Sequence, residues 1–425
     1  MKHIDKNRNT LFLVSEGIAA AVILNLFSPF TQMFAKRMGA GDLHIALINS
    51  LPPLVAILVL IPCSILIERV ADKKFVTGIM IVFNSIFYAI IAFTPNLPHE
   101  LRVIVYVVLI GLMNWPGALY TTSWQSFFSY TFTDKEANRI YSLRSKYGAF
   151  FGLITVLLTG LLLSTVPKSD SDRILLYQFF YGTCFLISMV QVFFLSGIRQ
   201  NSVDSANKQD SEKSDISLKD IKGVFANKPF MIFCACVFTF HIAWQMGWPL
   251  FFLYNADYIR VNEFQLGILN VASGLASFLS YPLWHKLAVK KGNSFVIIIG
   301  ALGLTTNPFF YTGIMPFYVI VAVNIIVGAA CAAFTMMLFC NLMEILPTSK
   351  KTMYISMYNT FINISGFIAP LLGIWMNRHT GIFRAMLIIG VLRTIGVGMF
   401  AFRWFLSLKE KENKSSAGQV YGRNQ

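Results

Sequence analysis

Two ionisable side chains, Glu16 and His241, stand inside long apolar stretches of the sequence. A charged group in an apolar environment is costly, and such groups usually serve a function. Imidazole binds and releases protons near neutral pH, and a carboxylic acid among apolar groups can do the same. Both residues are therefore candidates for a proton-coupling group. The alternative for each is a structural hydrogen bond inside a helix bundle.

His241 is part of a polar and aromatic stripe. With Trp244, Gln245 and Trp248 it follows the spacing i, i+3, i+4 and i+7, which is one face of a helix. Further amides and one tryptophan occur in other apolar stretches: Asn25, Gln32, Asn114, Trp115, Gln125, Asn324, Asn359 and Asn363. Amides and aromatic rings lining an apolar cavity suit a neutral polar or amphipathic organic solute, so we expect these residues to bind substrate. The alternative for the tryptophans is that they pack against neighbouring side chains and do not bind substrate.

The elements that carry these residues are long and apolar. Of the 425 residues 56% are hydrophobic and only 13% are charged, about half the charged share of a soluble protein. A helix of about 20 apolar residues spans a bilayer, and open sheets in lipid would leave backbone groups unpaired. We therefore expect an all-α polytopic membrane protein with twelve transmembrane helices. They run approximately Leu11–Phe34, His44–Ile67, Phe75–Thr94, Leu101–Phe128, Ile140–Val166, Ile174–Gly197, Pro229–Ala256, Phe264–Trp284, Ser294–Thr312, Pro316–Leu342, Thr352–Met376 and Ile382–Leu406.

The basic residues are distributed unevenly between the loops. If the N-terminus is cytoplasmic, 26 of the 35 Lys and Arg residues lie in cytoplasmic loops and tails or in the span ends beside them, and 8 lie in or beside outer loops. This asymmetry predicts that both termini are cytoplasmic. The net charge of +15 then reflects topology and contact with anionic membrane lipids, not nucleic acid. We expect a multi-pass protein of the plasma membrane.

One long polar stretch divides the chain. Residues 199–227 begin as Ser, Asn, Asp and Lys, and end in apolar residues interleaved with charges, a pattern typical of an amphipathic surface helix. We interpret this stretch as a cytoplasmic linker between an N-terminal six-helix bundle, residues 1–198, and a C-terminal one, residues 228–407. Residues 408–425 would form a cytoplasmic tail.

The two halves share a local pattern after their second apolar stretches. The segments Ser64–Lys74 and Tyr281–Lys291 align at an offset of 217 residues, with Leu, Ala and a final Lys-Lys pair in common. An offset of about half the chain indicates an internal repeat of six helices. The alternative is that any cytoplasmic loop is basic, which explains the lysines but less easily the Leu and Ala.

At the first of these loops the sequence resembles the Major Facilitator Superfamily of secondary transporters. The family signature there runs Gly-x-Leu-x-Asp-Arg-x-Gly-Arg-Arg. Leu66, Glu68 and Arg69 match it, and Lys73 and Lys74 supply its basic end. Ser and Ala replace the two glycines, and Glu replaces Asp. The twelve apolar stretches, the central loop and the repeat extend the resemblance over nearly the whole chain.

The resemblance implies two pseudo-symmetric six-helix bundles that transport by alternating access. It also implies a cytoplasmic latch around the signature loop, built from Glu68, Arg69, Lys73, Lys74, Arg139 and Arg144. The alternative is a solvated charge run that only fixes topology. In this family the helix of the His241 stripe faces the central cavity. The last helix lies at the periphery, where Arg393 would be structural or would extend to the membrane surface.

The sequence therefore predicts a secondary active transporter that moves a small organic solute, with proton coupling as a hypothesis. It contains no phosphate-binding loop and no intramembrane cluster typical of a metalloenzyme, so we expect no enzymatic activity, cofactor or metal. Besides the solute we expect protons and lipids as partners, and a monomer. The alternative is a membrane receptor or accessory protein that kept the fold. Efflux of drugs or amphipathic compounds and uptake of a neutral metabolite both stay open.

Overall fold

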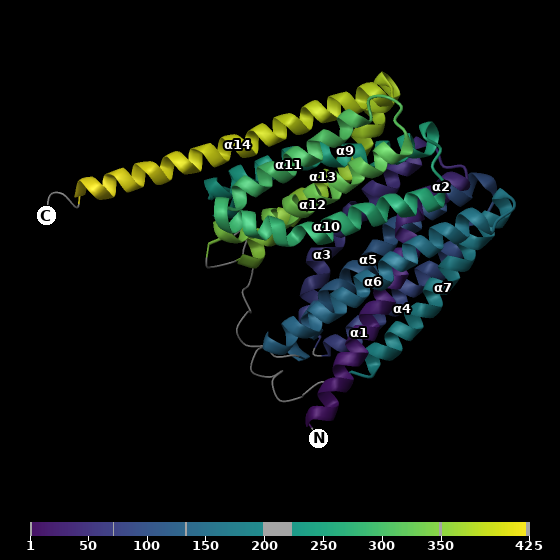
Figure 1. Cartoon of the computed structure of the whole chain (residues 1–425). Coiled ribbons are helices and arrows are strands. Elements are labelled where there is room, and N and C mark those ends of the chain that lie inside the picture. Colours follow the sequence, from purple (N-terminus) through teal and green to yellow (C-terminus); the bar gives the residue numbers. More distant parts are fainter. Residues whose placement is uncertain (1, 71, 132–133, 199–222, 348–350, 422–425) are drawn as a thin grey trace. The chain divides into compact units, whose positions relative to one another are not determined.

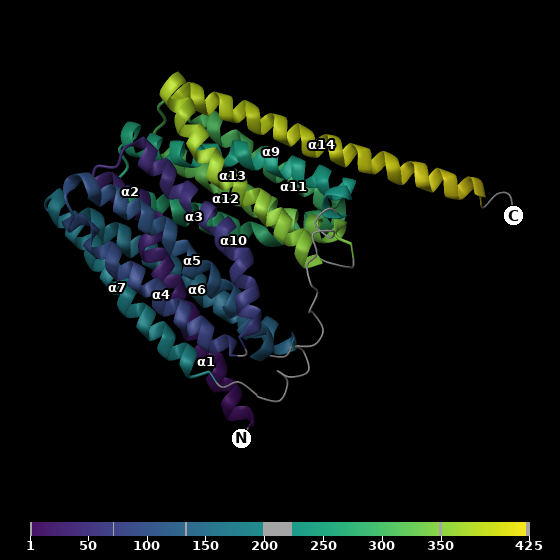
Figure 2. The same cartoon turned by 180° about the vertical axis from the view of Figure 1, so that it is seen from behind.

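The computed structural model describes residues 2–70, 72–131, 134–198, 223–347 and 351–421, which are almost entirely helical and contain no β-strand. Twelve of its helices are long and apolar enough to cross a membrane, which confirms the predicted fold class. Figures 1 and 2 show them as long rods. The helices are α1 (Lys2–Phe27), η1 (Ser28–Phe30), α2 (Thr31–Arg37), α3 (Asp42–Arg69), α4 (Lys73–Phe93), η2 (Thr94–Asn96), α5 (His99–Thr131), α6 (Asp134–Thr165), α7 (Asp170–Ser196), α9 (Lys228–Leu253), η3 (Tyr254–Tyr258), α10 (Glu263–Lys291), α11 (Asn293–Phe310), α12 (Phe317–Ile345), α13 (Lys351–Thr380) and α14 (Ile382–Tyr421).

Some helix ends differ from the predicted ones. The first span breaks into α1, η1 and α2, because Pro29 provides no backbone N–H to continue the helix. The last helix, α14, continues to Tyr421, past the end predicted at Leu406. Gly381 separates α13 from α14 with a φ of 79°, a conformation that glycine adopts without strain. The predicted linker falls largely on residues 199–222, which lie outside the described residues; residues 223–226 are helical.

The chain forms two compact units. The first contains Met1–Ile216 together with Asn255–Val271, and the second contains Ser217–Tyr254 and Ala272–Gln425. In the first unit α1 packs on α6 and α7, α3 packs on α5, and α4 packs on α5 and α7. The segment 255–271 belongs by sequence to the second half of the chain, but it packs with the first unit.

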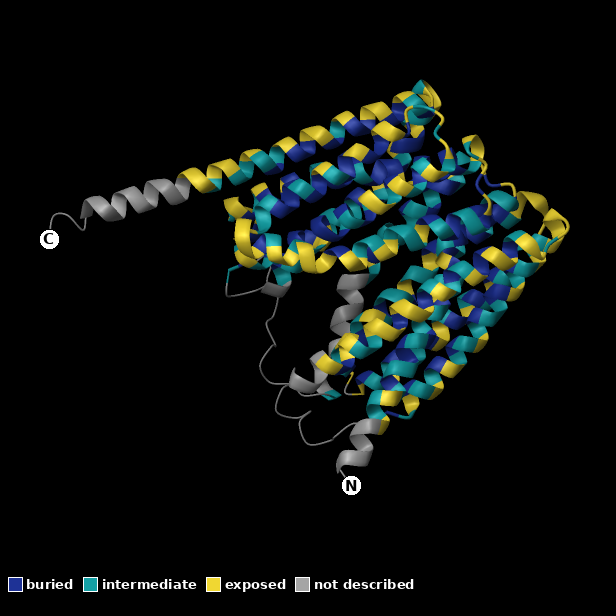
Figure 3. Ribbon diagram, viewed as in Figure 1, coloured by how far each residue is buried: buried dark blue, intermediate teal, exposed yellow. Residues whose placement is uncertain are grey.

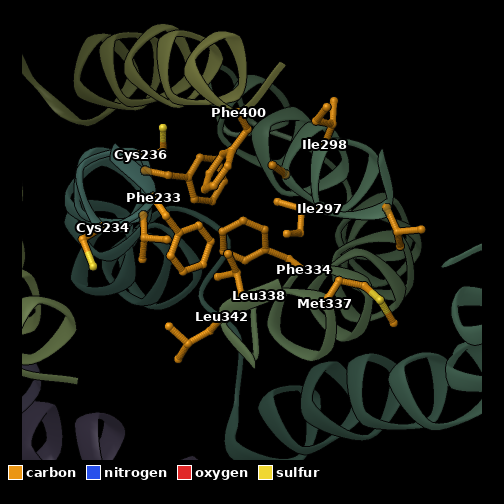
Figure 4. Packing of buried hydrophobic residues seen from close by; sticks show 14 of the residues in the cluster. Phe233, Cys234, Cys236, Ile297, Ile298, Phe334, Met337, Leu338, Leu342 and Phe400 are labelled. Carbon is orange, nitrogen blue, oxygen red and sulfur yellow. The ribbon is translucent and has the colours of Figure 1, made fainter. Parts of the chain in front are cut away.

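The second unit has a large aromatic core. In it α9 packs on α13 and α14, while α11 packs on α12 and α14. Phe233, Phe240 and Phe334 are completely buried there, and Phe400 nearly so. Figure 4 shows Phe233, Phe334 and Phe400 pointing toward one another between the helices. Buried and exposed residues alternate along the helices of both units (Figure 3), as expected when one face packs on protein and the other meets lipid.

Candidate functional site

The Glu16 carboxylate is the best-connected buried acid of the first unit. Its side chain has an exposed fraction of 0%. One oxygen, Oε1, accepts hydrogen bonds from the Tyr120 hydroxyl at 2.7 Å and from Gln191 Nε2 at 2.8 Å. The other, Oε2, accepts from Arg144 Nε at 3.1 Å and from Trp124 Nε1 at 3.3 Å. Four donors from α5, α6 and α7 therefore surround one carboxylate from α1.

The local sequence explains how these groups meet. Tyr120 and Trp124 lie four residues apart on α5, so both point toward α1 from the same face. Glycine at position 17 leaves room for the aliphatic part of Arg144, which would collide with a Cβ there. The Arg144 guanidinium then stacks on the Trp124 ring, with its Cζ 4.1 Å from the ring centroid. The arginine is thus held between an acid and an aromatic face.

The site combines predicted and unpredicted residues. Glu16 was a predicted candidate, and the structure gives it an ion pair. Arg144 was assigned to the cytoplasmic latch, but its guanidinium contacts Glu16. Tyr120 and Gln191 were not singled out. For Tyr120 the available signal was its spacing to Trp124; for Gln191 it was a lone amide in an apolar helix.

The remaining latch residues lie near the ends of predicted spans. The side chains of Glu68 and Arg69 lie outside the described residues. Lys73 is buried and Arg139 is exposed. Lys74 donates hydrogen bonds to the carbonyls at the end of α7, those of Ser196 and Ile198, both at 2.7 Å. The latch itself stays a prediction.

A second buried carboxylate, Glu263, lies at the start of α10. Arg37 at the end of α2 binds it with two nitrogens, Nε to Oε1 at 3.0 Å and Nη2 to Oε2 at 3.3 Å. The Tyr177 hydroxyl donates to Oε1 at 3.5 Å, and Arg173 Nε lies 3.9 Å away. Asp170 binds both arginines. The Glu263 side chain is completely buried, whereas that of Arg37 is 26% exposed.

The backbone of this turn lies directly on α6. A Cβ at Gly160 would come within 2.8 Å of the Glu263 carbonyl oxygen, so only glycine permits the approach. The Phe264 amide donates to Ser164 Oγ at 2.9 Å. Beside this turn, Lys36 and Asp257 form an ion pair, with 2.9 Å between Nζ and Oδ1. The sequence analysis missed this cluster because its charges lie at the ends of separate apolar stretches and were counted only as loop charges.

The His241 stripe lies on α9 in the second unit. The imidazole is 5% exposed, and its Nδ1 is 2.9 Å from the Val237 carbonyl oxygen one turn earlier. Its ring lies beside those of Trp244 and Phe334, at centroid distances of 5.5 and 5.8 Å. Among the described residues, no carboxylate forms an ion pair with it. These contacts match the alternative of a structural histidine more closely than that of a proton carrier.

The rest of the stripe is divided between buried and exposed positions. Gln245 is 4% exposed and accepts a hydrogen bond of 2.6 Å from the Ser365 hydroxyl of α13. Trp244 is half-buried, and Trp248 is 36% exposed. The predicted stripe therefore turns one edge into the core of the second unit and leaves the other edge open.

The other predicted solute-binding residues also differ in their surroundings. Asn25 and Asn324 donate to carbonyls of their own helices, Ala21 and Ile320, at 2.8 Å. Asn114 donates to the Pro52 carbonyl of α3 at 2.8 Å. Two of the others, Gln32 and Asn363, are half-buried. Three are exposed: Trp115, Gln125 and Asn359. Their role in binding solute stays a prediction.

Arg393 does not extend to the membrane surface. Its side chain is completely buried in the second unit and donates three hydrogen bonds to backbone carbonyls of α9 and α11. Of the two predicted alternatives, the structural one holds and the surface-seeking one is wrong. The physical reason is position: residue 393 lies near the middle of the apolar part of α14, Ile382–Lys409, where the side chain meets neighbouring helices before it can reach water.

The comparison with protein families decides what kind of protein this is. The family model of the Major Facilitator Superfamily matches residues 17–254 and again residues 233–421. The chain belongs to the Major Facilitator Superfamily. It is therefore a multi-pass membrane protein of a family of transporters, and the resemblance drawn from its signature loop is confirmed. The two matches, one for each half, also agree with the repeat seen in the sequence.

Solved structures of the superfamily share this fold. A mutant of the nucleoside transporter NupG matches with a TM-score of 0.72 and 14% identity, over 93% of this chain and 99% of that one. An inward-facing, unoccupied bacterial homologue of the human lysosomal transporter Spinster matches with a TM-score of 0.66 and 13% identity, over 96% and 98%. A bacterial homologue of the iron transporter ferroportin, also inward-facing, reaches 0.63 and 12%, over 93% and 99%. No curated protein sequence matches the chain.

Proposed function

We propose that this superfamily member is a proton-coupled transporter of a small organic solute, with Glu16 as the coupling group. The observation that carries the proposal is the ion pair of Glu16: its carboxylate is completely buried, and Arg144 Nε lies 3.1 Å from it. A buried acid at the centre of four donors is costly to form and is expected to serve a function.

A proton and Arg144 compete for the same carboxylate. In the structure both Glu16 oxygens accept two hydrogen bonds each. Proton binding to an oxygen would remove the negative charge that holds the guanidinium. Arg144 would then keep its contact with the Trp124 ring and a long hydrogen bond of 3.5 Å to the Tyr120 hydroxyl, without an opposite charge to hold it. Protonation can therefore be linked to a rearrangement of α1 against α5 and α6.

His241 is the weaker candidate for this role. Its ring is enclosed by aromatic side chains, and its described hydrogen bond goes to a carbonyl of its own helix. Among the described residues, a proton bound there would have no acid to stabilise it and no ion pair to break. We assign His241 instead to positioning Trp244 on the predicted solute-binding face.

The predicted solute-binding residues favour a solute that is neutral and polar or amphipathic. Their exposed members are one tryptophan and one amide in each unit: Trp115 and Gln125 in the first, Trp248 and Asn359 in the second. Rings and amides of this kind stack on and hydrogen-bond an uncharged organic molecule. No arginine or lysine is among them, so an anionic phosphate ester would lack a charged partner at these positions.

Alternating access needs a contact that closes one side of the protein. The ion pair of Arg37 and Glu263 joins residues from the two halves of the sequence, as such a contact must. The first turn of α10 comes from the second half of the sequence but packs on α6 in the first unit. With the termini in the cytoplasm, this turn lies at the outer end of the spans. We assign the Arg37–Glu263 pair to holding that end closed, and its rupture to opening.

Purified protein in liposomes tests the proposal. Solutes that raise the unfolding temperature of the protein are chosen first, because a ligand of the native state stabilises it. Wild type should then accumulate such a solute when a pH gradient is imposed. Glu16→Gln should exchange solute across the membrane but no longer respond to the gradient. Glu100→Gln, a carboxylate change at the exposed start of α5, serves as the matched control.

The outcomes are distinct. If Glu16→Gln responds to the gradient as wild type does, Glu16 is not the coupling group. If solute binds but wild type produces neither accumulation nor exchange, the protein is a receptor on a transporter fold.

A further inference from the structure

Arg393 joins three helices of the second unit through backbone carbonyls. From the apolar part of α14, Ile382–Lys409, its Nη1 donates to the Leu304 carbonyl of α11 at 2.7 Å. Its Nη2 and Nε donate to the Trp244 and Ala243 carbonyls of α9 at 2.9 and 3.3 Å. Among the residues that the structure describes, no acid forms an ion pair with it. A guanidinium buried with carbonyls alone is unusual, because burial of a charge is costly without compensation.

A proline explains why one of these carbonyls can accept the guanidinium. In an α-helix the carbonyl of residue i accepts the amide of residue i+4. For Leu304 that residue is Pro308, which has no N–H, so the helix itself provides no i+4 donor. In α9, Pro249 removes the donor for Gln245, whereas Arg393 binds the two preceding carbonyls, those of Ala243 and Trp244. Arg393 therefore binds α11 at the carbonyl that Pro308 leaves without a helix donor, and binds α9 just before the residue affected by Pro249.

The surroundings are shaped to hold the guanidinium. Glycine at position 247 faces it: a Cβ there would lie 2.8 Å from Arg393 Nη2. The Phe251 ring lies on another side, with its centroid 5.4 Å from Cζ, and its negative face attracts the cation. Gly247 and Phe251 both belong to the α9 segment around Pro249. The same short segment thus supplies space, an aromatic face and two acceptors.

We infer that Arg393 is a positioning residue that replaces the amide donor missing at Pro308 and fixes the backbone of α9 at Trp244. Through the Trp244 carbonyl it sets the orientation of the turn that carries Trp244, Gln245 and Trp248. The predicted effect on solute binding rests on the proposed function, in which this face binds solute. The predicted effect on the backbone of α9 is independent of the proposed function.

A double-mutant cycle tests the inference through stability. Arg393→Met removes the donors and should lower the unfolding temperature of the detergent-purified protein. Pro308→Ala supplies a backbone N–H for the Leu304 carbonyl, so in the Arg393→Met background it should recover part of the loss. Pro282→Ala, at an exposed proline inside α10, is the matched control and should recover none. If Pro308→Ala gives no more recovery than Pro282→Ala, Arg393 does not replace the missing donor.

Hydrogen–deuterium exchange separates positioning from general stability. In Arg393→Met the amides around residues 244–248 should exchange several-fold faster than in wild type, while those in α12 should change little. A uniform increase over the second unit, or none, would overturn the positioning role. Solute affinity is the third readout: Arg393→Met should raise KM more than it lowers the maximal rate. If wild type moves no solute, the proposed function fails, whereas the stability cycle and the exchange data still decide the role of Arg393.

Discussion

The two units each contain an arginine bound between helices, but they stabilise it in different ways. In the first unit Arg144 binds the Glu16 carboxylate, and its side chain keeps an exposed fraction of 18%. In the second unit Arg393 binds three carbonyls and is completely buried. A carboxylate can accept a proton and so release its arginine, whereas a carbonyl cannot. The first pair is therefore suited to a switch, and the second to a fixed support.

Four predicted stability effects follow, beginning with the largest. Arg144→Met should destabilise the protein by about 3–5 kcal/mol, because it leaves the Glu16 charge buried without its partner. The measurement is unfolding of the detergent-solubilised protein by denaturant. The double variant with Glu16→Gln should be less destabilised than Arg144→Met alone. Equal or greater loss in the double variant would show that the ion pair is not the source of the effect.

Arg393→Met should destabilise the protein by a smaller amount, about 1–3 kcal/mol. The variant leaves the buried Leu304 carbonyl without a donor, but it also removes a costly buried charge, so the two effects oppose each other. The same unfolding measurement checks this value. A loss as large as that of Arg144→Met would remove the distinction between an arginine bound to an acid and one bound to carbonyls.

Arg37→Gln should have a still smaller effect on stability, about 1 kcal/mol, although Glu263 is as deeply buried as Glu16. The difference is redundancy: Arg173 Nε lies 3.9 Å from the Glu263 carboxylate and Tyr177 donates to it, so a cation remains nearby. The larger effect should be on conformation. Reagents added from outside should label cysteines placed near the cluster faster in Arg37→Gln. Labelling at the wild-type rate would contradict the closing role of the pair.

Lys36→Gln should have the smallest effect, about 0–1 kcal/mol. Its ion pair with Asp257 is partly exposed, with 30% and 41% of the two side chains accessible, and water screens such pairs. This variant is the surface control for Arg37→Gln because it removes a neighbouring charge from the same turn. Outside labelling as fast as in Arg37→Gln would mean that net charge, and not the buried pair, controls this end.

The sequence alone predicted the twelve spans well, because hydrophobicity is a property of each segment and needs no knowledge of its neighbours. It also found Glu16, since an acid in an apolar helix is conspicuous. It could not find the partners of Glu16. Gln191 is 175 positions away along the chain, and only the packing of α1 against α7 brings the two together.

The residues at Glu263 and Arg393 show two further limits. The charges around Glu263 lie at span ends, where topology alone accounts for Lys and Arg, so their pairing had no separate signal. Arg393 did have one, because Pro308 leaves the Leu304 carbonyl without its helix donor and an arginine within an apolar span can supply one. The rule that arginines near a bundle periphery extend to the surface concealed it.

The central claim is that Glu16 can bind a proton in place of Arg144, and infrared difference spectroscopy tests it most directly. On acidification of the protein in lipid, wild type should show the C=O absorption of a newly protonated carboxylic acid that is absent in Glu16→Gln. Glu100→Gln should show the wild-type spectrum. Identical spectra for wild type and Glu16→Gln, at every pH where the protein stays folded, would contradict the claim.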